Sequence, residues 1–158
     1  MIRTKPFSET DKLRLWEIEK DPQISKKMPG AIKTHSELEE WLSENIVYGI
    51  CDTENNIIGF VQLYTMGKSL IQRLPLENKK NLYEISYALP EKYRYKNGLV
   101  SEAVREICAL YPNFQIVAFA SHDNEKSIRV LEHSGFTLIG KTKYHANEKT
   151  ENLVYKKA

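Results

Sequence analysis

The chain has 158 residues, of which 41% are hydrophobic and 28% charged, so it is long enough to bury a core and unlike a disordered segment in composition. Its 23 Lys and Arg against 21 Asp and Glu give a net charge of +2, too small to indicate a nucleic-acid-binding protein. No apolar run is long enough to cross a membrane, and the first residues lack a signal-peptide pattern. We therefore expect a single domain over residues 1–158, located in the cytoplasm, with no nucleic-acid or membrane partner.

The cysteines and histidines give no sign of a metal site. Cys51 and Cys108 lack C-x-x-C spacing, and single cysteines in strands and helices are usually small buried residues. The histidines are scattered without the spacing of metal ligands. We expect reduced thiols and no bound metal.

The N-terminal part of the chain predicts one strand and two helices. Residues 2–6 have strand character, and apolar spacing over residues 10–20 predicts a helix that ends before Pro22. Residues 23–33 are expected to form a loop. Thr34, followed by a glutamate with capping-box spacing, predicts the start of the second helix.

Two strand-like runs follow the second helix. Residues 46–51 and 57–64 are rich in β-branched and aromatic residues, and the polar segment 52–56 between them predicts an antiparallel hairpin. The next segment, residues 66–80, is longer than a usual hairpin connection. We expect it to hold a helical turn or to form a lid.

The most informative segment is the basic turn around Gly98, which joins an apolar strand at residues 83–89 to an amphipathic helix over residues 100–111. The first amides of a helix lack internal partners and lie at the positive end of its dipole, so a turn that lets them converge binds phosphate. Gly98 permits that close approach. Neither the dinucleotide-binding pattern G-x-G-x-x-G nor a P-loop is present. A plain connecting loop is the alternative interpretation.

A second informative segment follows the strand predicted at residues 114–120. Asp123 or Asn124 suits the N-cap of a short helix, and Gly135 suits the left-handed residue that ends it. Ordinary capping and termination of a helix explain the same residues without any ligand. This alternative stays open on spacing alone.

The predicted order of elements is β-α-α-β-β-β-α-β-α-β-β, closing with strands at residues 137–143 and 153–155. The strands at residues 83–89 and 114–120 are joined by a helix. A crossover of this kind makes two strands parallel, so we expect a mixed sheet.

Together, the two segments resemble the two signature regions of the GNAT superfamily of acetyl-CoA-dependent N-acetyltransferases. Asn124-x-x-Ser127 and Gly135-Phe136 match the second region. Gly98 takes the place of the middle glycine of the first region. The resemblance extends over nearly the whole chain.

The first region also differs from the family pattern, Gln/Arg-x-x-Gly-x-Gly/Ala. Tyr95 stands at its first position and Val100 at its last. Backbone amides do most of the phosphate binding in this loop, and Lys96 adds positive charge. The continuation over residues 101–104 resembles the ribosomal-protein N-terminal alanine acetyltransferases within the family.

The resemblance implies an α/β (α+β) GNAT fold, with a mixed central sheet of about seven strands flanked by about four helices and two splayed parallel strands. It also implies acetyl-CoA as co-substrate, with its pyrophosphate on the amides of the turn and its pantetheine arm along the splayed strands. The cofactor-binding residues implied are Leu89, Tyr95, Lys96, Asn97, Gly98, Leu99, Val100, Ser101, Asn124 and Ser127.

Acetyl transfer to an amine requires the neutral amine. An α-amino group has a pKa of about 8 and a lysine about 10.4, so a base must remove a proton near neutral pH. The resemblance implies Glu84, in the strand at residues 83–89, as this base. The alternative is a strand glutamate that faces solvent or forms a salt bridge.

The leaving thiolate requires a proton donor. The tyrosine that many family members carry on the helix after the signature asparagine is replaced here by Leu131. The resemblance then favours Ser127 as the group that hydrogen-bonds the sulfur, although a helical serine often bonds only to backbone. Tyr144 is a further candidate with less support.

The sequence thus predicts an N-acetyltransferase that acts on a primary amine, either a peptide α-amine or a small molecule. The acceptor pocket is expected to be walled by residues 23–33, 66–80 and 144–150. The alternative is a non-catalytic acyl-CoA-binding or regulatory protein of the same fold, suggested by the differences from the family pattern. We expect a monomer or a homodimer.

Overall fold

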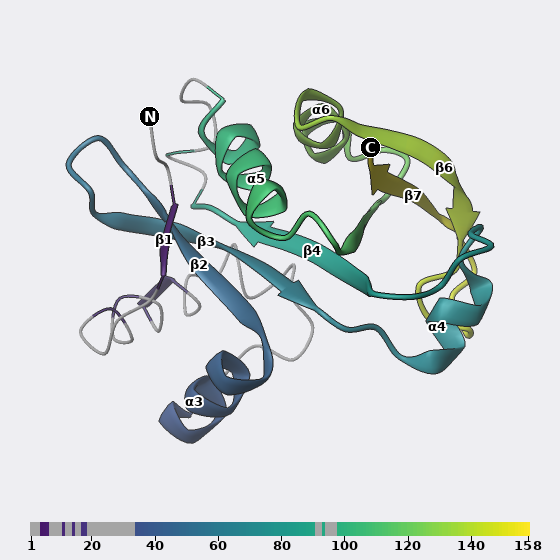
Figure 1. The fold of residues 1–158 in the computed structure, drawn as a ribbon, viewed down its shortest axis with the longest axis horizontal. Coiled ribbons are helices and arrows are strands. Elements are labelled where there is room, and N and C mark those ends of the chain that lie inside the picture. Colours follow the sequence, from purple (N-terminus) through teal and green to yellow (C-terminus); the bar gives the residue numbers. More distant parts are fainter. Residues whose placement is uncertain are drawn as a thin grey trace. The chain divides into compact units, whose positions relative to one another are not determined.

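The computed structural model describes residues 4–6, 11, 14, 17–18, 34–90, 93 and 98–158. Most of the helix expected over residues 10–20 and all of the loop expected over residues 23–33 lie outside this part. The elements in chain order are β1 (Thr4–Pro6), α3 (His35–Glu44), β2 (Ile46–Cys51), β3 (Ile57–Tyr64), α4 (Lys68–Arg73), β4 (Leu82–Ala88), α5 (Leu99–Leu110), β5 (Gln115–Ala120), α6 (Glu125–His133), β6 (Phe136–Thr142) and β7 (Asn152–Lys157), labelled in Figure 1.

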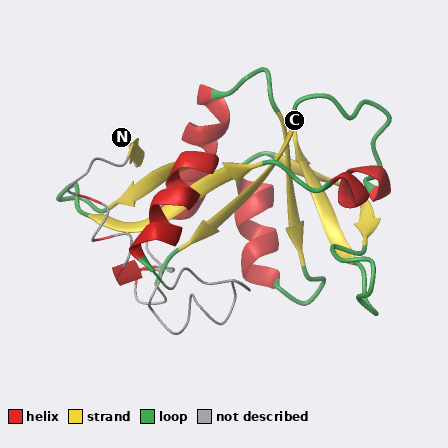
Figure 2. Ribbon diagram, turned by 90° about the horizontal axis from the view of Figure 1, so that it is seen from below, coloured by secondary structure: helices red, strands yellow, loops and turns green. Residues whose placement is uncertain are grey.

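The strands of the described part form one mixed seven-stranded sheet in the order β1-β2-β3-β4-β5-β7-β6. Figure 2 distinguishes its strands from the helices and loops. β4 and β5 are parallel and the other described pairings are antiparallel, so the expected mixed α/β fold with four helices is confirmed within this part of the chain. The splay of the parallel strands stays a prediction.

The chain forms two compact units. Unit 1 comprises residues 1–63 and 86–107, and unit 2 comprises residues 64–85 and 108–158. In unit 1, β2 and β3 form the predicted hairpin, with Ile46 opposite Leu63. The Asp52 carboxylate accepts backbone hydrogen bonds from the turn, and Asn55 takes a φ of 65°, which asparagine tolerates better than most residues.

Helix α3 packs against the apolar cluster of unit 1. Thr34 caps it with a complete capping box, as predicted, because its hydroxyl accepts from the Glu37 amide while the Glu37 carboxylate accepts from the Thr34 amide. Leu38 is 1% exposed and packs in one cluster with Phe60. The Trp41 ring meets the Phe60 ring edge to face at 5.3 Å, which fixes α3 against β3.

Unit 2 has a second apolar cluster beneath α4. Its members are contributed by α4, its flanks and three strands: Met66, Leu70, Leu74, Leu82, Val117 and Val154. The segment expected to hold a helical turn or to form a lid therefore forms helix α4, and its apolar residues pack into the core. α6 lies beside β5 and β6 in the same unit (Figure 1).

The ends of α6 agree with the sequence prediction. The Asn124 side chain accepts a hydrogen bond from the Ser127 amide at 3.2 Å and caps the helix. Gly135 ends it with a φ of 87°. Leu131, at the place of the family tyrosine, is 1% exposed and packs in the interior, so this position offers no proton donor.

Candidate active site

The expected phosphate-binding turn is described from Gly98 onward, while Tyr95, Lys96 and Asn97 lie outside the described residues. Gly98 has a φ of 66°, and a Cβ at this position would meet no atom within 4 Å. The glycine is therefore required by the backbone conformation rather than by lack of space. Its carbonyl accepts from the Glu102 amide at 2.9 Å and begins α5.

The side chains that follow Gly98 point into the protein. Leu99 and Val100 are each 8% exposed, and Ser101 is 6% exposed. These three residues therefore belong to the interior, and phosphate recognition by the amides of this turn stays a prediction. Val100, which differs from the family pattern, lies in the core.

Leu89, the residue expected to offer backbone groups to pantetheine, is 3% exposed and lies next to a close backbone approach. A Cβ on Gly59 would come within 2.4 Å of the Ala88 carbonyl oxygen and 2.7 Å of the Leu89 Cδ1. Only glycine fits at this point of β3. The sequence analysis missed Gly59, although a glycine inside a strand is a known signal of such an approach.

Asn124 and Ser127 are brought together at the start of α6. The hydrogen bond between them is that of a helix cap, so their spacing is explained by local structure as well as by a ligand. Asn124 is exposed and Ser127 is half-buried. Their roles toward a cofactor stay predictions.

Glu84 is buried, at 5% exposure, so the alternative of a solvent-facing glutamate is wrong. It lies opposite Val117 in the parallel pairing of β4 with β5. Its Oε2 accepts a hydrogen bond of 2.7 Å from the Tyr144 hydroxyl, and Tyr64 also hydrogen-bonds to the carboxyl. We call Glu84, Tyr64 and Tyr144 the Glu84 cluster.

Burial dominates the electrostatics of the Glu84 cluster. It raises the pKa of Glu84 from an ordinary 4.5 to about 7, and the hydrogen bonds from Tyr64 and Tyr144 limit this rise because they favour the carboxylate. Burial and the neighbouring Glu84 carboxyl also raise the pKa of Tyr144, which therefore keeps its proton near neutral pH. A carboxyl that titrates near pH 7 is suited to general-base catalysis.

Tyr144 belongs to the connection between β6 and β7. The sequence analysis named it as a further candidate for the proton donor to the leaving thiolate. Its ring meets the Phe119 ring edge to face at 5.0 Å. Its partner Glu84 is 60 residues away in the chain. No local sequence pattern signals such a contact.

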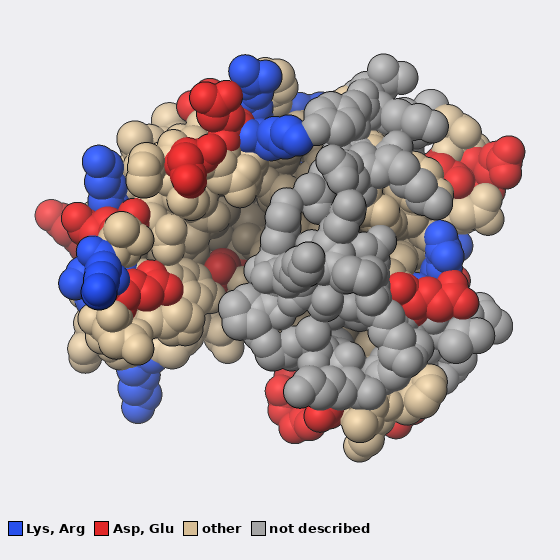
Figure 3. Space-filling view, turned by 180° about the vertical axis from the view of Figure 1, so that it is seen from behind, with Lys and Arg blue, Asp and Glu red and all other residues tan. Residues whose placement is uncertain are grey.

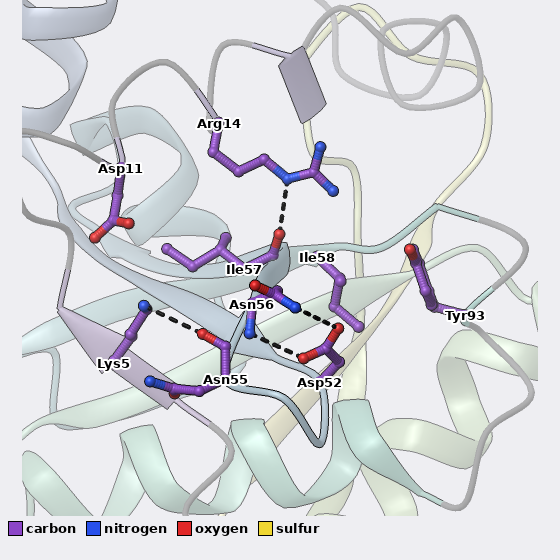
Figure 4. A pocket seen from close by; sticks show the side chains of 9 residues that line it. All are labelled: Lys5, Asp11, Arg14, Asp52, Asn55, Asn56, Ile57, Ile58 and Tyr93. Carbon is purple, nitrogen blue, oxygen red and sulfur yellow. Dashed lines mark hydrogen bonds between the residues drawn. The ribbon is translucent and has the colours of Figure 1, made fainter.

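A polar cavity of about 350 Å³ lies elsewhere, in unit 1 (Figure 4). The Arg14 Nε donates to the Ile57 carbonyl at 2.9 Å, and the Lys5 Nζ donates to the Asn55 carbonyl at 3.3 Å. These bonds support the β2–β3 hairpin, and the cavity includes no residue predicted to be catalytic or cofactor-binding. It is lined by Lys5, Asp11, Arg14, Asp52, Asn55, Asn56, Ile57, Ile58 and Tyr93.

Among the described residues, no group of His, Cys, Asp and Glu side chains is arranged to hold a metal ion. Cys51 and Cys108 are buried free thiols.

None of the helices in the described ranges has the length and apolar character needed to cross a membrane. On the face drawn in Figure 3, basic and acidic side chains are interspersed, in keeping with the net charge of +2.

A protein-family model described as an acetyltransferase (GNAT) domain matches residues 2–137. No curated protein matches the chain. The fold is similar to that of the aminoglycoside acetyltransferase AAC(6')-Ib in complex with paromomycin and acetyl-CoA, with a TM-score of 0.74 and 19% identity over 99% of this chain and 92% of the other.

Two further solved structures share the fold. The ribosomal-protein-S5-alanine acetyltransferase from Vibrio fischeri has a TM-score of 0.70 and 18% identity over 98% of this chain and 91% of the other. A spermidine N-acetyltransferase chimera from Vibrio cholerae and hSSAT has a TM-score of 0.67 and 14% identity over 98% and 93%.

Proposed function

The chain belongs to the GNAT acetyltransferase family, and we propose that it acetylates a primary amine from acetyl-CoA, with Glu84 as the general base. The observation that carries this proposal is the buried Glu84 carboxyl, hydrogen-bonded by Tyr144 and titrating near pH 7. The acceptor is a peptide α-amine or a small molecule. The resemblance at residues 101–104 favours ribosomal-protein N-terminal alanine as the first acceptor to test.

The reaction follows from the protonation state of Glu84. The acceptor arrives as an ammonium ion, and the Glu84 carboxylate takes its proton. The free amine then attacks the thioester carbonyl, a C–N bond forms and the C–S bond breaks. The second proton that the nitrogen loses passes to the departing CoA thiolate, and Glu84 returns the first proton to solvent. Acetyl-CoA supplies the acetyl group as an activated thioester, and holding amine and thioester together contributes much of the rate.

The residues of the chain fit this co-substrate. The positive φ at Gly98 and the open space around its Cα, directly before α5, support phosphate binding at this helix start. We assign pyrophosphate binding to the amides of residues 96–101, and pantetheine binding to the Leu89 backbone and to Asn124. The complete proposed set is Leu89, Tyr95, Lys96, Asn97, Gly98, Leu99, Val100, Ser101, Asn124 and Ser127.

Calorimetric titration with acetyl-CoA tests the proposed function. We expect micromolar binding that weakens when dephospho-CoA replaces CoA, because the phosphate end contributes to affinity. Turnover is then measured against peptides with N-terminal alanine, spermidine and an aminoglycoside. Absence of binding at millimolar acetyl-CoA would exclude the enzyme, and binding without turnover on any amine would favour the non-catalytic alternative.

Ser127→Ala is expected to lower kcat about tenfold, since it removes one hydrogen bond to the leaving sulfur. Affinity for acetyl-CoA should fall by less than kcat, since Ser127 is one of ten residues in the proposed cofactor-binding set. Steady-state kinetics with calorimetry separates the two effects. Ser43→Ala, at an exposed serine of α3, is the matched control. An unchanged kcat in Ser127→Ala would remove this serine from the mechanism.

We further propose a single functional domain over residues 1–158, working in the cytoplasm as a monomer or homodimer without a metal ion. Glu84 and Ser127 are its proposed catalytic residues. The proposed partner is the primary-amine acceptor, with no nucleic-acid or membrane partner.

A further inference from the structure

Arg73, the last residue of α4, holds the connection between β6 and β7. Its Nε donates to the Lys143 carbonyl at 3.2 Å, and its second terminal nitrogen donates to the Tyr144 carbonyl at 2.8 Å. The remaining terminal nitrogen donates to the Ser69 hydroxyl one turn earlier in α4. The planar guanidinium thus joins the helix to two successive carbonyls, which a single ammonium group cannot reproduce.

A second contact joins the residues just after α4 to strand β6. A Cβ on Gly140 of β6 would come within 2.9 Å of Pro75 Cγ, just after α4. Leu70 and Leu74 pack in the apolar cluster that Tyr144 also touches. The segment formed by α4 and the residues just after it therefore contacts both β6 and the connection that follows it.

Arg73 and Glu84 form hydrogen bonds with opposite ends of Tyr144. The backbone of Tyr144 is bound by Arg73, and its hydroxyl donates to Glu84. Between them, the tyrosine ring and the Phe119 ring pack in a T-shaped pair. A tyrosine fixed at its backbone and at its ring has little freedom to take its hydroxyl elsewhere.

We propose that Arg73 is a positioning residue for the general base: by holding the Tyr144 backbone, it keeps the tyrosine hydroxyl on the Glu84 carboxyl. This inference rests on the proposed function in so far as Glu84 is the base. It also gives the segment between β3 and β4 a role in positioning the general base.

The proposal has a direct consequence for proton transfer. The Tyr144 hydrogen bond favours the charged carboxylate and opposes the effect of burial on the pKa of Glu84. The other titratable groups that face this pair are Tyr64 at the end of β3, and His145 and Glu148 in the connection. Since these remain in an Arg73 variant, loss of the Tyr144 contact should raise the pKa of Glu84 further.

The test is a carboxyl ¹³C NMR titration of Glu84, assigned by the signal that disappears in Glu84→Gln. In Arg73→Gln we expect the midpoint to rise by about 1 pH unit. The rising limb of the kcat/KM pH profile should shift equally, with a fall in kcat and little change in KM for acetyl-CoA. Arg73→Lys keeps the positive charge but can donate to only one of the two carbonyls. Its Glu84 midpoint should therefore rise by less than that of Arg73→Gln.

Lys79→Gln is the matched control. The Lys79 Nζ donates to the Gln72 carbonyl at 2.9 Å, so this variant also loses a cation at the end of α4, but the lost contact does not reach the Tyr144 backbone. It should titrate like the wild type. Tyr144→Phe should shift the Glu84 midpoint as Arg73→Gln does, and the double variant should shift it no further, because both remove the same contact.

An unshifted Glu84 midpoint in both Arg73→Gln and Arg73→Lys would overturn the proposal, as would shifts in the double variant that add in full. The NMR midpoint does not depend on turnover. A shifted midpoint in a protein that acetylates no amine would therefore support the positioning role and reject the base function.

Discussion

Glu84→Gln should slow acetyl transfer by about 10²- to 10⁴-fold, the usual contribution of a general base. Glutamine keeps the shape of the side chain and can still accept the Tyr144 hydrogen bond, but it cannot take the proton of the acceptor. Steady-state kinetics should show the loss in kcat, and calorimetry should show unchanged affinity for acetyl-CoA. The wild-type kcat/KM should rise as the pH passes about 7, the pKa of Glu84, and the variant should lack this limb.

The same substitution should make the folded protein more stable above neutral pH. Burial raises the pKa of Glu84 from 4.5 to about 7, so the folded state binds this proton more tightly than the unfolded state. The free energy of unfolding therefore falls as the pH rises from about 4.5 to about 7, and the full penalty is present above that range. It is on the order of 3 kcal/mol, which Glu84→Gln removes at pH 8.

Urea denaturation at pH 5 and pH 8 measures this effect. The variant should exceed the wild type by about 3 kcal/mol at pH 8 and by less than about 1 kcal/mol at pH 5, where the wild-type carboxyl is already protonated when folded. Glu77→Gln, at an exposed glutamate, serves as the control. Equal turnover in Glu84→Gln and wild type would remove Glu84 from the chemistry. A variant that is inactive and also less stable at pH 8 would indicate a structural role instead.

Local signals explain most of the fold that the sequence predicted. The hairpin of β2 and β3, the capping box at Thr34 and the ends of α6 at Asn124 and Gly135 were all predicted correctly, since each depends on residues close together in the chain. The parallel pairing of β4 with β5 was predicted from chain connectivity. These features required no knowledge of tertiary packing.

The burial of Glu84 and its hydrogen bond from Tyr144 depend on tertiary packing, so the sequence around Glu84 did not predict them. Alternation along β4 puts Glu84 and Ile85 on opposite faces, and in a sheet with one solvated face the glutamate would be outside. β4 is an inner strand of the sheet, and both residues are buried, at 5% and 3% exposure. Its Tyr144 partner comes from a distant connection, and the Arg73 contact spans 71 residues. Sequence spacing carries no information on such pairs.

Gly59→Ala should destabilise the protein by about 3 kcal/mol, because the added methyl group meets a carbonyl oxygen at 2.4 Å rather than the end of a flexible side chain. β3 and the Ala88 backbone must separate to admit it. For a chain of this length, the thermal midpoint should fall by about 9 °C. The same displacement moves Leu89, whose backbone we assign to pantetheine, so the Kd for acetyl-CoA should rise about tenfold.

Thermal unfolding and calorimetric titration of Gly59→Ala test both effects. Gly67→Ala is the matched control, since a Cβ on Gly67 meets no atom within 4 Å and its φ of −64° is open to alanine. It should keep the wild-type affinity and lose less than about 1 kcal/mol. If Gly59→Ala destabilises the fold without changing affinity, the displacement does not reach the cofactor and Leu89 is not part of its site. If affinity falls in step with stability, the close approach of β3 to Leu89 shapes the surface that binds acetyl-CoA.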